Sequence, residues 1–268
     1  PVLHAASLPP LALNEDDKRA VVTGADFEVV FDKVQGRLVS LKRQGVELLS
    51  QGPALHVWRA PTDNDEPPSR RRECMGMRWR EAGLDRVEHR LQAAEVVARS
   101  PHAVRIRFLT RVAAEGKTGF RHEHVYTVFG SGDVVIDNGV VCDEGLPPLP
   151  RLGLRMALPP GFERFAWYGR GPHENYVDRR EGAGVGLYEC TVDDLYVPYI
   201  MPQEHGNRAD VRWAALTNDQ GFGLLAVGMP LLEVSAGHFT DEDLAQARHT
   251  HELVRRPEVT LRLDYRQS

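Results

Sequence analysis

Cysteine is scarce in this sequence of 268 residues, and the three cysteines that occur are widely spaced. They are Cys74, Cys142 and Cys190, and no two of them form a C-x-x-C pair. An odd number at such spacing argues against a disulfide framework and against a structural zinc site. We therefore expect free thiols, a reducing, cytoplasmic location and no metal site built on cysteine.

Long apolar runs and an excess of positive charge are also missing. No stretch approaches the roughly 20 apolar residues that a membrane-spanning helix needs. Lys and Arg total 33 against 38 for Asp and Glu, which gives a formal net charge of −5. Such a chain has no long-range positive field that would hold a phosphate backbone. We therefore expect neither a membrane nor a nucleic acid as a partner.

Helical periodicity is rare, and the pattern that dominates is alternation with period two. In residues 26–50, apolar and polar residues alternate and glycines stand at the bends, which predicts successive antiparallel strands. Residues 102–114, 120–142 and 221–237 repeat this pattern. The sequence therefore predicts an all-β protein, with a large antiparallel two-layer β-sandwich as the simplest architecture.

Two segments depart from the alternation and predict short helices. One lies near residues 68–84, and the other follows Thr240, whose hydroxyl can cap a first turn that is rich in acid. Residues 1–24 are rich in proline and predict a tether from a preceding domain, so the chain is expected to be cut from something longer. Residues 25–268 then form one sandwich domain, in which the Pro-rich residues 142–153 are a rigid crossover between sheets.

The first of three polar clusters is WRAPTDND, which contains Arg59, Asp63, Asn64 and Asp65. Two carboxylates at this spacing could act as acid and base, or hold a hard cation through oxygen ligands. Asp and Asn are equally what a turn selects, because their side chains satisfy local backbone amides. The turn interpretation is favoured over the metal interpretation.

The second cluster is GRGPHENYVDR, in which Gly169, Gly171 and Pro172 set a bend at the end of a strand. Arginines, carboxylates and amides beside Trp167 and Tyr168 are typical of sugar-binding surfaces, since hydroxyls need polar partners and pyranose faces need aromatic rings. A network that pins the turn to a neighbouring domain explains the same residues. Both interpretations stay open. The candidate residues here are His173, Glu174, Asn175, Tyr176, Asp178 and Arg179.

The third cluster combines RHTHEL with MPQEHGNR, a segment that also contributes Asn207 as a candidate. His249 and His251 would share one face of a strand, and Glu204 or His205 could complete a metal site. No H-E-x-x-H or C-x-x-C accompanies them. Solvent-facing or interface histidines are therefore favoured over zinc, and no metal site is predicted.

Four segments carry a resemblance to a known family: WRAPTDND, WYGRGPHENYVDR, VPYIMPQEHGNR and LRLDYRQS. They occur in the same order and at similar intervals as in the C-terminal domain of the large β-galactosidases of glycoside hydrolase family 2. The resemblance covers residues 26–268. It implies a supersandwich of the kind also seen in galactose mutarotases, in agreement with the period-two pattern.

The resemblance implies a supporting role in the hydrolysis of β-galactosides. Enzymes of this family are similar in using two glutamates of a central α/β barrel in a retaining mechanism. The motifs that carry those glutamates find no match here, so no catalytic residue is predicted and the isolated chain is expected to be inactive. The implied partner is the catalytic barrel domain, beside which the chain helps to shape the galactoside site.

The same resemblance implies no cofactor in this chain, while Mg²⁺ and Na⁺ would belong to other domains of the enzyme. Galactose is expected to bind the chain weakly or not at all. In related enzymes a tryptophan near the end of the domain, after a glycine-rich turn, forms part of the sugar site, and this chain stops at Gln267 and Ser268, where such a turn would begin. We expect a truncated C-terminal end that leaves an unpaired edge or an uncovered apolar strip, and hence association into a homo-oligomer through the C-terminal region.

The candidate residues of the three clusters are thus predicted to be substrate-binding or domain-interface residues. Two other functions stay open. A free-standing aldose 1-epimerase of the same fold would use His173 or His249 with Glu174 to move a proton between sugar oxygens. A carbohydrate-binding module would bind galactose or lactose without any reaction.

Overall fold

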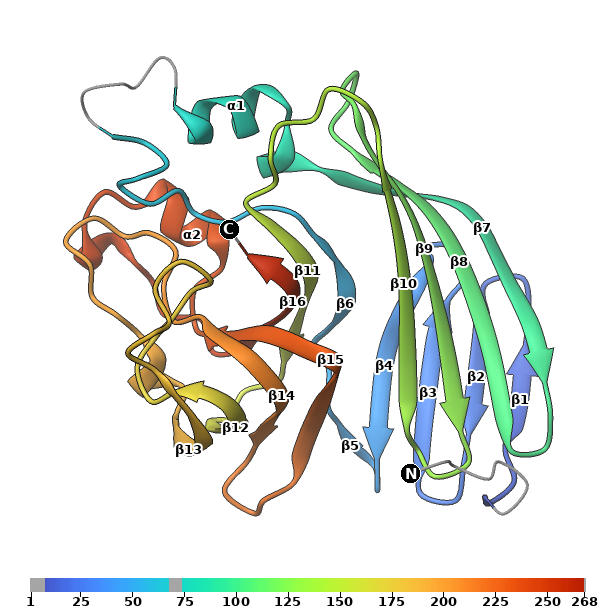
Figure 1. Ribbon diagram of the computed structural model, residues 1–268. Coiled ribbons are helices and arrows are strands. Elements are labelled where there is room, and N and C mark those ends of the chain that lie inside the picture. The colour runs from blue at the N-terminus through green and yellow to red at the C-terminus, as the bar shows by residue number, and fades with distance from the viewer. Residues whose placement is uncertain (1–7, 68–73, 268) are drawn as a thin grey trace. The chain divides into compact units, whose positions relative to one another are not determined.

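Antiparallel strands dominate the computed structural model, which describes residues 8–67 and 74–267 (Figure 1). The chain divides into two compact units. The first unit consists of Pro1–Pro53 and Arg86–Leu146, and the second of Ala54–Asp85 and Pro147–Ser268. The predicted all-β, antiparallel sandwich with one or two short helices is confirmed.

Two antiparallel sheets form the first unit, and Figure 1 shows them face to face. The five-stranded sheet has the order β1-β2-β3-β4-β5, and the four-stranded sheet has the order β10-β9-β8-β7. The first sheet contains β1 (Ala12–Glu15), β2 (Arg19–Thr23), β3 (Phe27–Asp32), β4 (Arg37–Arg43) and β5 (Val46–Glu47). The second contains β7 (Glu88–Arg99), β8 (Ala103–Ala113), β9 (Gly119–Phe129) and β10 (Val134–Cys142).

Apolar side chains that alternate along the strands fill the space between these two sheets. On β3, Phe27, Val29 and Phe31 are buried, and the residues between them are half-buried. The ring of Phe31 meets Phe108 of β8 at a centroid distance of 6.2 Å and Tyr126 of β9 at 5.1 Å. The period-two pattern therefore produces a two-layer core, as the sequence predicts.

The segment expected to be a tether includes β1 and β2. From Arg19 opposite Asp32 to Thr23 opposite Glu28, β2 pairs with β3, and its residues Ala20 and Val22 are fully buried. Two alternating apolar residues are a weak indication of a strand, and the prolines that precede them favour an irregular segment instead. Residues 1–7 lie outside the described part of the chain.

The second unit is built on a seven-stranded sheet with the order β13-β12-β14-β15-β16-β11-β6. Its strands are β6 (Gln51–His56), β11 (Arg151–Leu158), β12 (Arg164–Gly171), β13 (Gly184–Thr191), β14 (Arg208–Thr217), β15 (Gly223–Gly237) and β16 (Val259–Gln267). The helical elements are α1 (Met75–Glu81), α2 (Asp241–Gln246) and the short 3₁₀ turns η2 (Leu84–Arg86), η3 (Asp193–Leu195) and η4 (Thr250–Glu252).

The helix expected after Thr240 is α2, and its N-terminus has the predicted cap. The Thr240 hydroxyl accepts a hydrogen bond from the Asp243 amide at 3.2 Å, and the Asp243 carboxylate accepts one from the Thr240 amide at 2.9 Å. This is a reciprocal capping box. The other expected helix is α1, although residues 68–73 of its predicted range lie outside the described residues. No helix in the described ranges is long and apolar enough to cross a membrane.

The two faces of the seven-stranded sheet differ in exposure. Phe165 and Trp167 of β12 point to one face and are buried. On the opposite face, Tyr168 is paired with Leu187 of β13 on one side and with Trp213 of β14 on the other. Trp213 is paired in turn with Val227 of β15. Leu187 and Val227 are 69% and 62% exposed. An apolar row thus crosses four strands on a face that is open to solvent in this structure.

Candidate functional site

The loop that contains MPQEHGNR lies between the other two polar clusters of the second unit. The Glu204 amide donates to the Ala60 carbonyl at 3.2 Å, and the Asp63 amide donates to the Gln203 side chain at 3.2 Å. These bonds join the loop to WRAPTDND. Motifs that are about 140 residues apart in the sequence are therefore neighbours in the fold.

The same loop is bound to GRGPHENYVDR. The Asn175 amide donates to the Asn207 carbonyl at 2.9 Å, and the Asn207 side chain donates back to the Asn175 carbonyl at 3.0 Å. The Asn175 side-chain oxygen accepts from the Ala209 amide at 2.8 Å. Both asparagines are fully buried. The side-chain amides of both asparagines therefore satisfy backbone groups that have no partner in a β-sheet.

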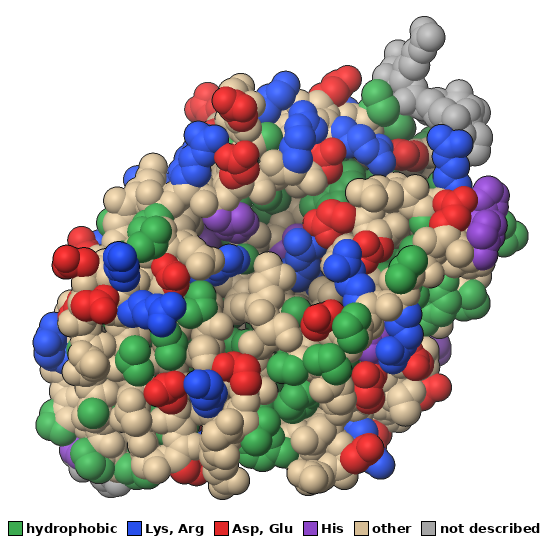
Figure 2. Space-filling model, turned by 180° about the vertical axis from the view of Figure 1, so that it is seen from behind, with side chains coloured by type: hydrophobic (Ala, Val, Ile, Leu, Met, Phe, Trp, Pro, Cys, Tyr) green, Lys and Arg blue, Asp and Glu red, His purple; other side chains and the backbone are tan. Residues whose placement is uncertain are grey.

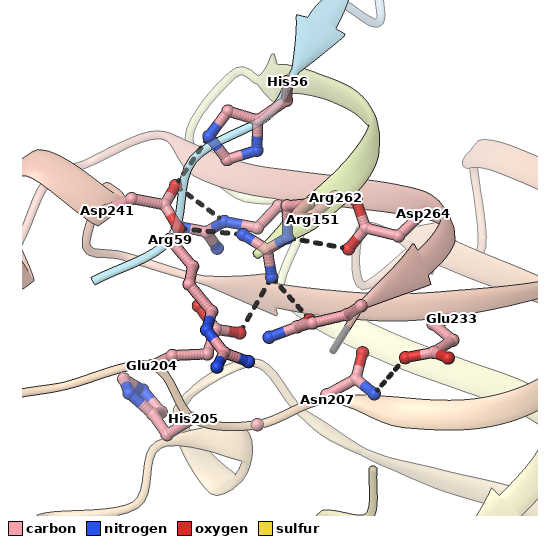
Figure 3. A network of polar contacts seen from close by, with 12 residues as sticks. His56, Arg59, Arg151, Glu204, His205, Asn207, Glu233, Asp241, Arg262 and Asp264 are labelled. Carbon is pink, nitrogen blue, oxygen red and sulfur yellow. Dashed lines mark hydrogen bonds and ion pairs between the residues drawn. The ribbon is translucent and has the colours of Figure 1, made fainter. Parts of the chain in front are cut away.

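A buried arginine lies at the centre of this region (Figure 3). Arg151, at the start of β11, is bound to Glu204 at 2.8 Å, Asp241 at 2.8 Å and Asp264 at 3.0 Å. It also donates to the Gln267 side chain at 2.8 Å. Burial disfavours the charge of Arg151, but the surrounding carboxylates raise its pKa above the ordinary value. The arginine is therefore a permanent cation that joins β11, α2, β16 and the loop of Glu204.

Asp241, the first residue of α2, has further basic side chains around its carboxylate. Arg262 lies 3.0 Å from its carboxylate, and Arg155 and His56 each lie 3.3 Å away. Burial opposes the charge of Asp241, but the neighbouring arginines, with Arg262 first among them, hold its pKa below the ordinary value. Burial lowers the pKa of His56 well below its ordinary value, so this imidazole is neutral.

Two further buried acids have raised pKa values. Burial raises the pKa of Asp264 to about 7, with contributions from the nearby carboxylates of Glu204 and Glu233, while Arg151 opposes the shift. Burial also raises the pKa of Glu233, whose carboxylate accepts from the Asn207 side chain at 2.9 Å. The neighbouring arginines therefore do not fully offset the free-energy cost of burying these carboxylates in their ionised form.

The network suits positioning better than chemistry. Glu204, Asp241 and Asp264 are each 3% exposed or less, and each forms an ion pair with Arg151. A general acid or base has to reach a substrate, whereas these groups hold backbone segments together. The arrangement can therefore fix the loops that carry the motifs.

Arg59 and Asp65 close the WRAPTDND turn as an ion pair. A guanidinium nitrogen of Arg59 lies 2.9 Å from both oxygens of Asp65, and both residues are buried. The amide and the hydroxyl of Thr62 donate to the same carboxylate at 2.8 and 2.9 Å. This geometry is that of the turn interpretation. Asp63 and Asn64 are exposed at its tip.

Glu174 plays a similar part in the second cluster. Its carboxylate accepts from the Gly206 amide at 2.8 Å, from Arg179 at 2.9 Å and from the Tyr199 hydroxyl. Burial opposes the charge of Glu174, but these donors together lower its pKa. The Arg179 guanidinium also lies 4.5 Å from the ring centre of Tyr176, which is buried. His173 and Asp178 are exposed on either side.

The two histidines of RHTHEL are not on a strand, in contrast to the expectation. His249 precedes the η4 turn and His251 lies within it. Glu204 is bound to Arg151, and His205 lies 2.9 Å from the Gln203 carbonyl. The residue that approaches the histidines is instead Glu252, at 3.0 Å from His249.

The residues at the centre of the network are not among those that the sequence motifs predict. Asp264 stands within LRLDYRQS in the polar phase of an alternating strand, so the pattern predicts an exposed side chain, whereas the structure buries it. Arg151 follows the prolines of the expected crossover, where nothing in the local pattern marks it. The missed residues are His56, Arg151, Glu233, Asp241, Arg262 and Asp264.

A pocket of about 500 Å³ borders the network, with Glu204 and Arg262 in its lining. The ring of Tyr196 meets those of His205 and Phe239 at centroid distances of 5.1 and 5.4 Å, and all three line the pocket. Aromatic faces beside charged hydrogen-bonding groups are the combination that sugars require. On the face shown in Figure 2, basic and acidic side chains are interspersed.

Fold and site together define an antiparallel β-sandwich protein in which three motif-bearing loops are hydrogen-bonded to one another beside a buried ionic network. The family model that describes the β-galactosidase small chain matches residues 23–268. The chain therefore belongs to the β-galactosidase small chain family.

Individual relatives agree with this assignment. A β-galactosidase of Priestia megaterium is 34% identical over 98% of this chain, and one of Psychromonas ingrahamii is 32% identical over 94%. A β-galactosidase of Halalkalibacterium halodurans is 35% identical over 87% of the chain. The alignment covers 24% of the first two relatives and 22% of the third, so the chain spans about a quarter of their length.

Proposed function

We propose that this chain is the non-catalytic C-terminal part of a β-galactosidase, which packs against the catalytic domain and helps to shape the galactoside site. The observation that carries the proposal is the match of nearly the whole chain to about a quarter of each β-galactosidase relative. In those relatives other domains accompany this one. The engaged, buried carboxylates around Arg151 support a structural role.

The motif residues divide into two roles in this proposal. The buried members hold the loops in place, and the exposed members are offered to the catalytic domain or to a sugar. Fixed exposed groups bind a partner with little loss of conformational entropy. The buried members are Arg59, Asp65, Asn175, Tyr176, Glu204 and Asn207. The exposed members are Asp63, Asn64, His173, Asp178 and Arg179, with Glu174 partly exposed between them.

The apolar row on the seven-stranded sheet supplies a second contact surface. Tyr168, Leu187 and Val227 lie in one row, and Leu225, 59% exposed, stands in the neighbouring row. Contiguous exposed apolar patches mark interaction sites. Because about three quarters of each relative lies outside this chain, we assign the row to contact with that remaining part of the β-galactosidase.

The pocket beside Glu204 is the proposed contribution to sugar contact. Tyr196 and Phe239 offer rings to a pyranose face, and the half-exposed Arg255 offers donors to its hydroxyls. In the assembled enzyme, Tyr196→Ala should raise KM for a β-galactoside more than it lowers kcat, because only binding contacts are lost. An unchanged KM would remove the pocket from the sugar site.

Reconstitution tests the proposal as a whole. The purified chain is mixed with the separately produced remainder of the β-galactosidase, and hydrolysis of a chromogenic β-galactoside is followed. The chain alone should be inactive, and it should raise the activity of the remainder until binding saturates. The proposal would be overturned if the highly purified chain hydrolysed the substrate, or if addition of the chain did not change the activity of the remainder.

Matched variants test the apolar row in the same assay. Leu187→Glu and Val227→Glu should each weaken association at least about tenfold, since a charge would be buried at the contact. Val34→Glu is the control, because Val34 is 65% exposed in the first unit and outside the row. Equal effects from all three variants would show that the row is not the contact.

A further inference from the structure

The η4 turn after α2 gathers three side chains that commonly bind metal ions. The turn comprises Thr250–Glu252, and His249 precedes it. The Glu252 amide donates to the His249 carbonyl at 3.1 Å, which closes the turn. Since residues three apart stand on the same side of a 3₁₀ turn, His249 and Glu252 are held as neighbours.

The ligand atoms of this group are already close together. One such atom from each of His249, His251 and Glu252 lies within 4.8 Å of the other two. The two imidazole rings are stacked with an angle of 18° and a centroid distance of 5.4 Å. Ligand atoms of a tetrahedral zinc ion are about 3.4 Å apart, given bond lengths near 2.1 Å. Small side-chain rotations would bring the three groups to that spacing.

We propose that His249, His251 and Glu252 bind a divalent transition-metal ion of the zinc class. Two imidazoles and one carboxylate match zinc in ligand type, whereas Mg²⁺ and Ca²⁺ prefer oxygen ligands alone. All three side chains are exposed, so the ion enters from solvent and water completes its coordination. This site goes beyond the proposed β-galactosidase role and does not depend on it.

A neighbouring bond orients the carboxylate. The Arg248 amide donates to Glu252 Oε2 at 2.8 Å, while Oε1 is the oxygen that approaches His249. Such outer bonds restrict the orientation of a ligand and improve metal affinity. Thr250 of the same turn and Leu253 just after it line the pocket beside Glu204. A bound ion would therefore stiffen one wall of that pocket.

Calorimetric titration with ZnCl₂ tests the site directly. All proteins carry Cys142→Ser, because Cys142 is an exposed thiol and could bind zinc by itself. We expect one zinc ion per chain, with a dissociation constant on the order of 10 µM or tighter. His249→Ala and His251→Ala should each weaken binding at least about tenfold, and Glu252→Gln by a smaller factor. An excess of Mg²⁺ should not compete.

His173→Ala is the matched control, because His173 is an exposed histidine on a different loop. It should bind zinc as tightly as the parent protein. Thermal melts in EDTA should be the same for all variants, which shows that each is folded. Absence of stoichiometric binding, or a His251→Ala variant that binds zinc like the His173→Ala control, would overturn the proposal.

Discussion

Phe31 and Arg151 are the centres of the two units, and their surroundings differ in kind. Phe31 is enclosed by apolar rings such as Phe108 and Tyr126. Arg151 is enclosed by carboxylates such as Glu204 and Asp241. Removal of methylene groups from an apolar core lowers stability in proportion to the number removed. Removal of one partner from a buried ion network leaves another charge buried without compensation. We therefore expect substitutions in the first unit to lower the free energy of unfolding in small steps, and the loss of one charged partner in the second unit to lower it steeply.

The largest effect is expected from Arg151→Ala. It leaves Glu204, Asp241 and Asp264 without their shared cation, and breaking a buried pair costs about 3 to 5 kcal/mol. Urea unfolding measures the loss. Arg164→Ala is the control, because Arg164 is 54% exposed and its ion pairs are at the surface, where a pair contributes about 1 kcal/mol or less. Equal losses in the two variants would contradict the comparison.

A smaller effect should follow from pH through Asp264. Its folded pKa of about 7 lies above the ordinary 3.8, so the folded state holds a proton that the unfolded state releases between about pH 4 and 7. The stability that this proton contributes is therefore lost as pH rises through 7. Buried His56 and His124, with lowered pKa values, act in the opposite direction, and Asp264 is not among the charges that shift either pKa.

Asp264→Asn isolates this contribution. The unfolding free energy of the variant minus that of the parent protein should increase by up to about 2 kcal/mol between pH 5 and 7 and then level off. Urea unfolding at a series of pH values measures the difference. A difference that is constant with pH would mean that Asp264 is ionised throughout and fully compensated by Arg151.

The smallest effect is expected from Ile106→Val in the first unit. Ile106 of β8 is buried, and removal of one methylene group from a core costs about 1 kcal/mol. Urea unfolding should show this modest loss at every pH. A loss as large as that of Arg151→Ala would remove the contrast between the two units.

The sequence predicts the first unit better than the second. Strands β3 and β8 show their burial directly as alternation, and the cap of α2 depends only on Thr240 and Asp243, three residues apart. These signals are local. The β1–β2 pair was missed because its alternation is short and follows prolines.

The site was predicted only in its loops. Arg59, Glu174 and Glu204 stand in recognisable motifs, and the structure brings these motifs together. Arg151, by contrast, meets Glu204, Asp241 and Gln267 across 53, 90 and 116 residues of sequence. No local pattern reveals such partners, since the fold alone decides which charges are buried together.

Backbone amide hydrogen exchange of the parent protein and Arg151→Ala tests most directly whether this arginine holds the motif-bearing loops of the second unit. We expect β11, β16 and the loop of residues 203–207 to lose protection in the variant, while β3, β8 and β9 keep theirs. Unchanged protection around residues 203–207, or an equal loss in both units, would contradict it.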